Sequence, residues 1–508
     1  MSRSTSRRSF LKSTGAVGSV WGLADVGFLK HLPTVSAAEA VPDPKRVLLS
    51  EDIEPLVRLL EDTPRDQLME KVAARIHGGA TYREILAALL LAGVRNVQPR
   101  PVGFKFHAVL VVNSAHLASL ASPDEHRWLP IFWALDYFKD AQAQNASQGD
   151  WHLGPVDEAA VPHADKAHAA FVAAMDQWDE KGVDAAVTGL ARHAGINETY
   201  ELLFRYGCRD FRDIGHKAIY AANSFRTLQT IGWQYAEPVL RSLAYAMLQH
   251  EGENPAQRDA PADRPGRRNL ELAKKFRADW TSGRRDSGAT HDLLMTLRSG
   301  DENAACDKVV ELIERKIAPQ SIWDAFHVAG GELLARQPGI VGIHTVTSTN
   351  ALHYAFQTAA SDDHRRLLLL QNAAFLPMFR AAMQGRGALK DFKLDELEPA
   401  DVQASGADAI TEIMSDISSD RTLAAKKILG YARKNPAPQS LFDAARVLVF
   451  FKGRDAHDYK FSSALLEDYR NVSPGWRERY LAAGVFNLKG AAAPDNALVP
   501  RIQAALKA

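Results

Sequence analysis

Four histidines recur along this chain in matching surroundings, and imidazole is a side chain that ligates metals and transfers protons near neutral pH. Each one follows an alanine- and leucine-rich stretch and begins another. They are His107, His216, His344 and His457, at intervals of 109, 128 and 113 residues. An internal repeat of this length predicts an architecture of equivalent units, and it identifies the side chains that the copies share.

The first and third copies agree position by position, with an offset of 237 residues. In both, an Ala-Gly pair is followed by a proline and then by the repeated histidine, with an asparagine and a second histidine at the sixth and ninth positions after it. The shared positions are Ala92, Gly93, Pro101, His107, Asn113 and His116 in one copy, and Ala329, Gly330, Pro338, His344, Asn350 and His353 in the other. Six positions in one register indicate a common unit.

The other two copies are more divergent. The fourth is aligned with the third by an offset of 119, which pairs Pro-Gln-Ser-Ile-Trp-Asp-Ala at 319–325 with Pro-Gln-Ser-Leu-Phe-Asp-Ala at 438–444. The second copy is the weakest and shares a Thr-Tyr pair, at 199–200, with the first copy. The sequence therefore predicts four divergent units of several helices each, at about 41–150, 151–252, 269–395 and 396–508, with an irregular linker at 253–268.

Length and composition favour one large helical body. The chain has 508 residues, of which 46% are hydrophobic, so it can bury a sizeable core. Alanine, leucine and arginine are abundant, whereas alternating runs of β-branched residues are scarce. We therefore expect a single all-α repeat domain over residues 41–508, in which the four divergent repeats pack into one helical body.

The first forty residues have the pattern of a targeting segment. Ser-Arg-Arg-Ser-Phe-Leu-Lys at 6–12 precedes a mildly apolar stretch and small residues before position 40. This segment resembles a twin-arginine signal peptide, which implies a passage through the twin-arginine translocase and a periplasmic or otherwise extracytoplasmic location. That route exports folded proteins, often with a cofactor already inserted, so a cofactor becomes more probable. Asp25 interrupts an apolar run too short to cross a bilayer, and no stable membrane span is expected.

Charge and motif content exclude several classes of function. Without the five basic and two acidic residues of positions 1–40, 56 basic and 59 acidic groups remain, which leaves no basic field for nucleic acid. Walker A, GxSxG, HExxH, CxxC and glycine-rich dinucleotide patterns are absent, so nucleotide and zinc-protease chemistry has no support. The only cysteines are Cys208 and Cys306, and an oxidising compartment would allow them to form a disulfide.

Helix geometry decides which histidines can meet. Nine residues advance a helix by about 900°, so His107 and His116 would lie on opposite faces of one unbroken helix and could not ligate one ion. We expect the four repeated histidines at helix starts, after connections that contain glycine or proline, with their side chains directed to a common centre. At the position of His116 and His353, the other two copies have Phe225 and Leu466, which favours a packing role.

Three chemical roles are open for such a centre. Three or four neutral imidazoles would form a site for Fe, Mn, Cu or Zn with an open position for a small ligand. A pocket without metal would use histidine as a general acid or base, and a structural role would only cap backbone groups in a polar core. Lys460 lies one turn after His457 and is expected either to face the same pocket, where it would position an anionic or carbonyl oxygen, or to be a solvated lysine.

With these residues the chain resembles a divergent bacterial member of the questin oxidase-like family. The resemblance covers most of the chain after position 40. It rests on the His107 segment, on Gly-His-Lys-Ala-Ile at 215–219, on His-Thr-Val-Thr at 344–347 with Ala-Leu at 351–352, and on Asp-Ala-His at 455–457 with Lys460. The second segment of the family commonly carries another histidine four residues on, where this chain has Tyr220.

The resemblance implies an oxidoreductase of the oxygenase kind, which inserts oxygen beside the carbonyl of a polyketide anthraquinone or xanthone in a Baeyer–Villiger-type reaction and uses NADPH. The substrate would be an aromatic or polyketide-like small molecule in the pocket around the four histidines and Lys460. These five are the candidate catalytic residues, and the four histidines are also the candidate metal ligands. A non-enzymatic helical-repeat protein that binds a partner on its concave surface, and a histidine-dependent hydrolase or lyase, remain as alternatives.

Overall fold

The structure is a computed structural model and describes residues 46–47 and 49–507. The predicted twin-arginine segment at 1–40 lies outside them. The described residues are all-α, as the composition predicts, and pack into one body. They contain no β-strand, only one isolated bridge between Arg284 and Ile317. The division into four repeat units stays a prediction.

The first half of the chain contains eleven of the described α-helices. Those between residues 54 and 147 are α3 (Glu54–Asp62), α4 (Leu68–His77), α5 (Tyr82–Asn96), α6 (His107–Leu110), α7 (Val112–Leu120) and α8 (Leu129–Ser147). Those between residues 164 and 247 are α9 (Ala164–Gln177), α10 (Glu180–His193), α11 (Ile196–Gly207), α12 (His216–Ile231) and α13 (Ala236–Met247).

The second half contains the other twelve. From residue 264 to 384 they are α14 (Arg264–Leu272), α15 (Ser287–Ser299), α16 (Glu302–Glu314), α17 (Pro319–Arg336), α18 (Ile340–Thr358) and α19 (Asp362–Gln384). From residue 406 to the last described residues they are α20 (Gly406–Ser419), α21 (Arg421–Lys434), α22 (Gln439–Lys452), α23 (Ala456–Asn471), α24 (Pro474–Ala483) and α25 (Leu498–Lys507).

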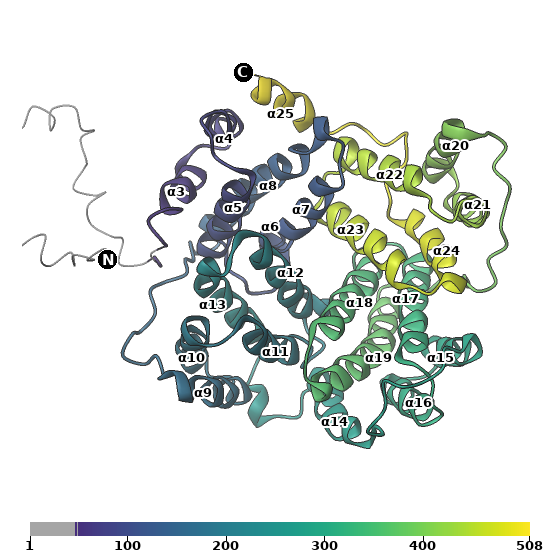
Figure 1. Cartoon of the computed structure of the whole chain (residues 1–508), viewed down its shortest axis with the longest axis horizontal. Coiled ribbons are helices and arrows are strands. Elements are labelled where there is room, and N and C mark those ends of the chain that lie inside the picture. Colours follow the sequence, from purple (N-terminus) through teal and green to yellow (C-terminus); the bar gives the residue numbers. More distant parts are fainter. Residues whose placement is uncertain (1–45, 48, 508) are drawn as a thin grey trace, which may run out of the picture. The chain divides into compact units, whose positions relative to one another are not determined.

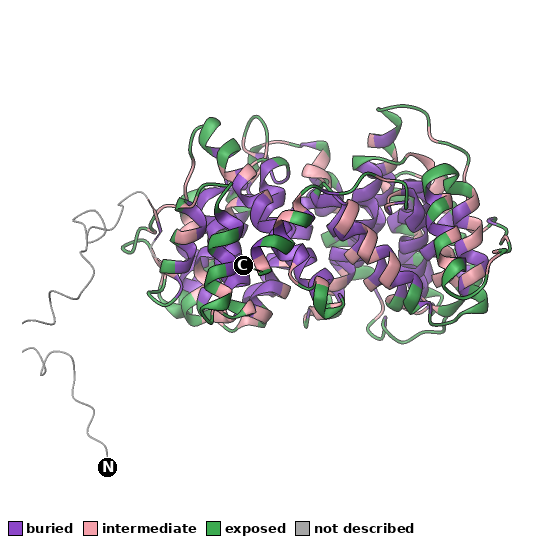
Figure 2. Cartoon of the chain, turned by 90° about the horizontal axis from the view of Figure 1, so that it is seen from above, coloured by how far each residue is buried: buried purple, intermediate pink, exposed green. Residues whose placement is uncertain are grey.

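Four of these helices close a ring in the middle of the body. Helix α7 packs against α12, α12 against α18, α18 against α23, and α23 back against α7 (Figure 1). Buried residues lie mainly on the inner sides of the helices, and exposed residues lie mainly on the outside (Figure 2). Each helix of the ring, or the short α6 that leads into α7, carries one of the four repeated histidines near its start.

Local sequence signals explain where several helices begin. Thr81 and Glu84 form a reciprocal capping box at the start of α5, and Asp455 and Asp458 form one at the start of α23. Proline occupies the first turn of α17 and of α24, where its missing N–H costs no intrahelical bond. The cap at Asp455 matters most for the site, because the residue after next is His457.

The segment 253–268 departs from the expected irregular linker. It contains two short 3₁₀ turns, Pro255–Gln257 and Pro261–Asp263, and α14 already begins at Arg264. Arg212 donates to both carboxylate oxygens of Asp263, at 2.6 and 2.7 Å. The proline and charged residues that suggested a linker thus form capped turns and ion pairs with the body, because their acidic and basic groups have partners elsewhere in the chain.

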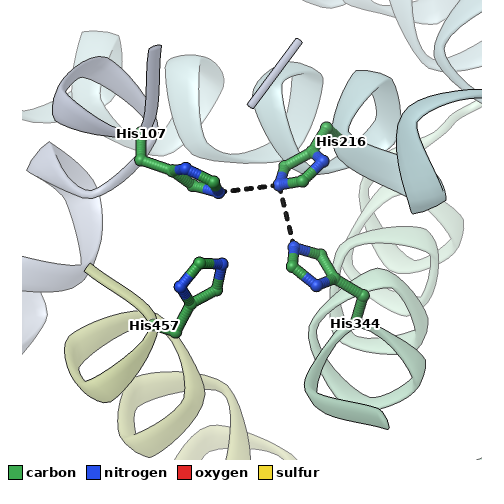
Figure 3. A group of neighbouring side chains, drawn as sticks. All are labelled: His107, His216, His344 and His457. Atoms are coloured by element: carbon green, nitrogen blue, oxygen red, sulfur yellow. Dashed lines mark hydrogen bonds between the residues drawn. The ribbon is translucent and has the colours of Figure 1, made fainter. Parts of the chain in front are cut away.

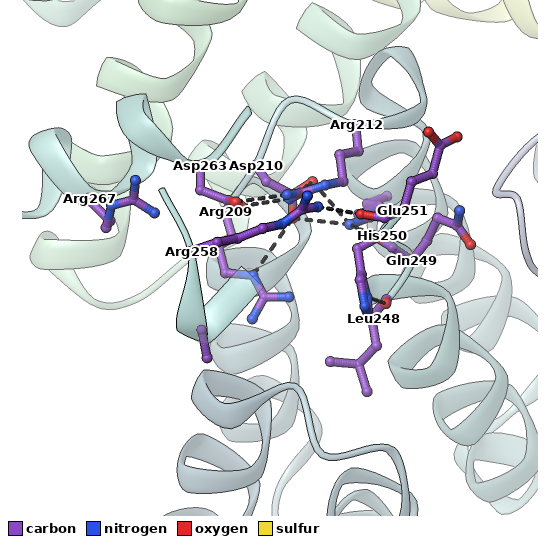
Figure 4. A network of polar contacts seen from close by, with 12 residues as sticks. Arg209, Asp210, Arg212, Leu248, Gln249, His250, Glu251, Arg258, Asp263 and Arg267 are labelled. Carbon is purple, nitrogen blue, oxygen red and sulfur yellow. Dashed lines mark hydrogen bonds and ion pairs between the residues drawn. The ribbon is translucent and has the colours of Figure 1, made fainter. Parts of the chain in front are cut away.

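A buried polar network holds the connection that leads into α12 (Figure 4). Lys217 Nζ lies 3.0 Å from both carboxylate oxygens of Asp210 and 2.8 Å from the carbonyl oxygen of Gln249. Burial lowers the pKa of Lys217 to about 8, although Asp210 opposes the shift. Because Lys217 directly follows His216, this network fixes the first turn of α12.

Two further expectations concern the cysteines and the membrane. Cys208 and Cys306 are both buried and free, so the disulfide that an oxidising compartment would allow is not formed. Among the described residues, every helix is too short or too polar to cross a bilayer.

Candidate functional site

The four repeated histidines converge on one point at the centre of the helical ring (Figure 3). Taken around the ring, the centroids of neighbouring imidazoles are 4.8, 4.3, 5.2 and 4.5 Å apart, from His107 through His216, His344 and His457 back to His107. One nitrogen from each ring lies within 4.8 Å of the others. Residues from four distant parts of the sequence therefore form one tetrahistidine cluster.

Strained connections position the first two histidines. Gly103 and Phe104 precede His107 with positive φ angles of 136° and 47°. Asp213, Ile214 and Gly215 precede His216 with φ of 50°, 47° and 82°. Positive φ in non-glycine residues costs of the order of 1–3 kcal/mol each and is concentrated at functional sites. The cluster is thus held by backbone conformations that the surrounding packing must impose.

Two glycines are required by close contacts. A Cβ at Gly103 would lie 3.2 Å from Cε1 of His216, and a Cβ at Gly215 would overlap the side chain of Ser348. Both residues also have positive φ, which an L side chain tolerates poorly. These glycines let two connections approach the cluster closely enough for the imidazoles to meet.

The Nδ1 atom of each imidazole in the cluster is bound by an oxygen acceptor. In His107, His216 and His344 it donates to the carbonyl oxygens of Phe104, Asp213 and Ile340, at 2.8, 2.5 and 2.6 Å. In His457 it contacts the carboxylate of Asp455. Carbonyl oxygens only accept, so Nδ1 carries the proton in the first three rings and the Nε2 lone pair is free. Histidines that ligate metals are oriented in this way.

The Nε2 atoms then face one another without a proton to share. Nε2 of His216 lies 2.9 Å from Nε2 of His107 and 2.8 Å from Nε2 of His344. Nε2 of His457 is buried and has no hydrogen-bond partner. Two lone pairs at this distance repel each other, so an additional proton or a metal cation between them would relieve the repulsion.

Burial keeps these imidazoles neutral. All four side chains are buried, with His344 fully inaccessible to solvent. Burial lowers the pKa of His107, His216 and His344 well below the usual value of 6.5, and the charge of Lys460 and the neighbouring histidines lower it further. Burial also lowers the pKa of His457, although Asp455 opposes the shift. Neutral imidazole is the form that binds metals.

Lys460 is buried beside the cluster and is not the solvated lysine of the alternative interpretation. Only 3% of it is exposed, and its Nζ has no hydrogen-bond partner. Burial lowers its pKa to about 7, against the attraction of Asp455. The positive charge of Lys460 lowers the pKa of all four histidines. Near neutral pH this amine can both accept and give up a proton.

A cavity of about 610 Å³ opens onto the cluster, and His107, His216 and His457 line it. Its other walls combine apolar and charged side chains: Phe104, Tyr137, Ile214, Ile340, Lys105 and Arg386. Phe104 is 76% exposed and Ile340 39% exposed, so apolar side chains lie at the accessible side of the cavity. A cavity of this volume and lining suits a small molecule with an aromatic body and a few polar groups.

A polar layer lies on the side of the cluster where Lys460 is. The asparagines that follow three of the histidines, Asn113, Asn223 and Asn350, line a small internal space together with Lys460. Arg226 bonds Asn223 and Asn350 at 3.4 and 3.3 Å and pairs with Glu467 at 2.6 Å. The asparagine positions shared in the sequence therefore form a second layer behind the histidines and do not join them.

The two histidines predicted to pack lie outside the tetrahistidine cluster. His116 bonds the hydroxyls of Tyr82 and Thr230, at 3.0 and 3.3 Å. His353 bonds His327 on α17, at 3.0 Å. Both lie nine residues after a histidine of the cluster, so the helix directs them to the opposite face, as the geometry predicts.

Several residues in or near the site carry little or no signal in the sequence. Asp455 appeared only as part of a family segment, although a carboxylate two residues before a repeated histidine signals a partner for Nδ1. Tyr137 lines the cavity from α8 and carries no signal in the repeat. No pattern in the sequence marks His327 or Asp468, because they lie on different helices at positions that the copies do not share.

Comparisons of the chain with protein-family models, with curated proteins and with solved structures found no significant match. The function must therefore be argued from the chemistry of the site.

Proposed function

We propose that this protein is an exported oxidoreductase that holds a transition metal ion in the tetrahistidine cluster and oxidises an aromatic or polyketide-like small molecule in the adjoining cavity. The observation that carries the proposal is the orientation of the imidazoles. Their Nδ1 atoms are bound by oxygen acceptors, and their Nε2 atoms face one another at 2.8 and 2.9 Å. A bound cation would turn this repulsion into four attractive contacts.

The spacing of the nitrogens fits a single ion. Two pairs of Nε2 atoms lie 2.9 and 2.8 Å apart, and one nitrogen of each ring lies within 4.8 Å of the others. Four neutral imidazoles would hold Fe, Mn, Cu or Zn. Of these ions, Fe, Mn or Cu would supply the redox chemistry of an oxidation.

The remaining residues of this chain have roles around that ion. Phe104, Tyr137 and Ile340 would contact the apolar body of the substrate in the cavity. Lys105 and Arg386 would bind an acidic or carbonyl oxygen at its edge. Lys460, behind the cluster, would exchange a proton near neutral pH, because its pKa is about 7. NADPH is left out of the proposal, because export would take the protein away from the cellular pool of that reductant.

Elemental analysis of the protein purified from its exporting host tests the metal. We expect close to one Fe, Mn or Cu per tetrahistidine cluster, and a lower occupancy after alanine replaces any of the four histidines. His116→Ala is the matched control, because His116 is buried and hydrogen-bonded but lies outside the cluster. Equal metal content in the control and in all four cluster variants would reject the centre.

Turnover is tested with hydroxylated anthraquinones and xanthones, with and without NADPH. With O2 and an added two-electron reductant such as ascorbate or NADPH, we expect oxygen uptake in the wild-type protein and in His116→Ala. The product should gain one oxygen atom, while the other oxygen atom takes the two electrons and leaves as water. Ala141 lines the cavity but is not a member of the ligand set, so Ala141→Trp should narrow the cavity and abolish turnover while the metal stays bound. Oxygen uptake that survives this change would place the reaction elsewhere.

The acid–base alternative is a histidine-dependent hydrolase or lyase, and it is favoured by one specific observation. Lys460 is buried beside the cluster, its charge lowers the pKa of all four histidines, and its own pKa is about 7. If the purified protein holds no metal and adding Fe²⁺, Mn²⁺ or Cu²⁺ has no effect on its thermal unfolding, this alternative replaces the oxidoreductase. Loss of activity in Lys460→Met would then identify the proton carrier.

A further inference from the structure

A second group of potential ligands lies outside the tetrahistidine cluster, between α17, α18 and α23. His327, His353 and Asp468 each offer one ligand atom, and these atoms lie within 4.8 Å of one another. Nε2 of His327 is 3.0 Å from Nδ1 of His353, and its Nδ1 is 3.5 Å from Oδ2 of Asp468. All three residues are buried, with Asp468 fully inaccessible to solvent.

Neighbouring groups orient all of these side chains. Tyr480 donates to one carboxylate oxygen of Asp468 at 3.1 Å, and the side-chain amide of Asn350 donates to the other at 2.8 Å. The indole of Trp323 stacks on the imidazole of His353, with centroids 4.4 Å apart and an interplanar angle of 26°. Ligands of a metal site are commonly fixed by such outer hydrogen bonds and packing.

Without a cation this group is incompletely satisfied. Nδ1 of His327 is buried and has no hydrogen-bond partner. Burial raises the pKa of Asp468 well above its usual value, and nearby Glu467 raises it further, whereas burial lowers the pKa of His327 and His353. A carboxylate inaccessible to solvent is costly unless a cation is next to it.

We propose that His327, His353 and Asp468 bind a second metal ion, a divalent first-row transition metal such as Zn²⁺, Fe²⁺ or Mn²⁺. Two imidazoles and one carboxylate are a donor set that these ions share. His327 binds the ion through one of its two ring nitrogens, and the ion compensates the charge of the carboxylate. The site is closed to solvent and therefore stabilises the packing of α17 against α18 and α23.

The two centres share two helices. Helix α18 carries His344 and His353, and α23 carries His457 and Asp468. The members of each pair are nine and eleven residues apart, which places the centres about 15 Å from each other along the helices. An ion at the second centre thus rigidifies the two helices that present half of the tetrahistidine cluster.

The experiment separates the two centres by removing one at a time. The double variant His216→Ala/His344→Ala lacks the first centre, and Asp468→Asn lacks the charge of the second while keeping its shape and an acceptor for Tyr480. Each protein is unfolded, freed of metal with a chelator, refolded with excess Co²⁺ and washed. Its Co²⁺ content and visible spectrum are then measured, together with its thermal unfolding.

We expect two Co²⁺ ions per chain in the wild-type protein, one in the double variant and one in Asp468→Asn. The triple variant, which combines His216→Ala, His344→Ala and Asp468→Asn, should bind none. Co²⁺ should raise the unfolding temperature of the double variant but not that of the triple variant. His116→Ala controls for the loss of a buried histidine elsewhere and should keep both ions.

The outcomes distinguish this proposal from the proposed function. One Co²⁺ per wild-type chain that Asp468→Asn retains and the double variant loses overturns the second centre and leaves the first. One Co²⁺ that Asp468→Asn loses and the double variant retains supports the second centre and overturns the first. If the double variant binds no Co²⁺ and shows no shift in unfolding temperature with it, the second centre is also overturned.

Discussion

The two histidine clusters of this protein differ in where their ligands lie along the helices. The tetrahistidine cluster uses residues at or near helix starts, two of them after strained connections, and faces a cavity of about 610 Å³. His327 and His353 lie in the interior of α17 and α18, and Asp468 lies in the last turn of α23, where α23 is packed into the core. One cluster is therefore accessible to a small molecule, and the other is part of the core.

This difference in position implies different roles: the first cluster binds a small molecule, and the second stabilises the fold. A helix start leaves backbone groups free and lets a connection bend close to the side chain, so a pocket can form in front of it. The interior of a packed helix offers no such space, and a ligand set there is enclosed by neighbours such as Trp323 and Tyr480. We therefore expect changes in the first cluster to alter turnover and changes in the second to alter unfolding.

The largest effect is expected when two histidines of helix α18 are compared, one from each cluster. His344→Ala removes a ligand of the tetrahistidine cluster and should weaken metal binding there by roughly a hundredfold or more, since even outer partners of ligands contribute tenfold or more. His353→Ala should leave that affinity unchanged and lower the unfolding temperature instead. Competition with a chelator and thermal unfolding measure the two quantities. Equal losses of affinity in both variants would remove the distinction between the clusters.

The next effect concerns the buried cation beside the first cluster. In the metal-free protein the pKa of Lys460 is about 7, whereas an unfolded lysine has a pKa of about 10.5. Between these values the unfolded chain binds more protons, so Lys460 makes stability rise with pH, by roughly 2 kcal/mol from pH 7 to 9. Lys460→Met should remove this slope in urea unfolding. Parallel pH profiles of the two proteins would show that folding does not lower the pKa of Lys460.

Asp455→Asn tests how the first cluster is oriented. The variant keeps an acceptor for the cap of α23 but loses the charge that faces Nδ1 of His457. We expect metal affinity to fall by roughly tenfold to a hundredfold, with stability changed by less than about 0.5 kcal/mol. Metal titration and urea unfolding of the same preparations give both numbers. A large loss of stability with intact affinity would assign Asp455 to the helix cap alone.

The smallest effect compares two glycines with similar backbone angles. Gly103 and Gly339 have φ of 136° and 144°, but an added Cβ would press on His216 only at Gly103, since nothing lies within 4 Å of it at Gly339. Alanine at either position should cost of the order of 1 kcal/mol of stability. Only Gly103→Ala should also reduce metal occupancy, measured by elemental analysis. A similar reduction in Gly339→Ala would mean that backbone strain, not the contact with His216, controls the site.

The sequence predicted the tetrahistidine cluster because its members repeat. His107, His216, His344 and His457 share spacing with their surroundings, and equivalent positions in packed helices come together. Helical periodicity was sufficient to place Lys460 near His457 and to direct His116 and His353 away from the cluster. It was not sufficient to find His327 with Asp468, since 141 residues separate them and their copies do not match.

The sequence by itself determined the all-α class, because composition and periodicity act locally, and it determined which histidines recur. The tertiary structure alone decided that three carbonyl oxygens and Asp455 hold the Nδ1 atoms, so that the Nε2 atoms face one another. It also decided that Cys208 and Cys306 stay apart as free thiols. Backbone carbonyls are the same in every residue, and only the path of the folded chain directs one of them to an imidazole.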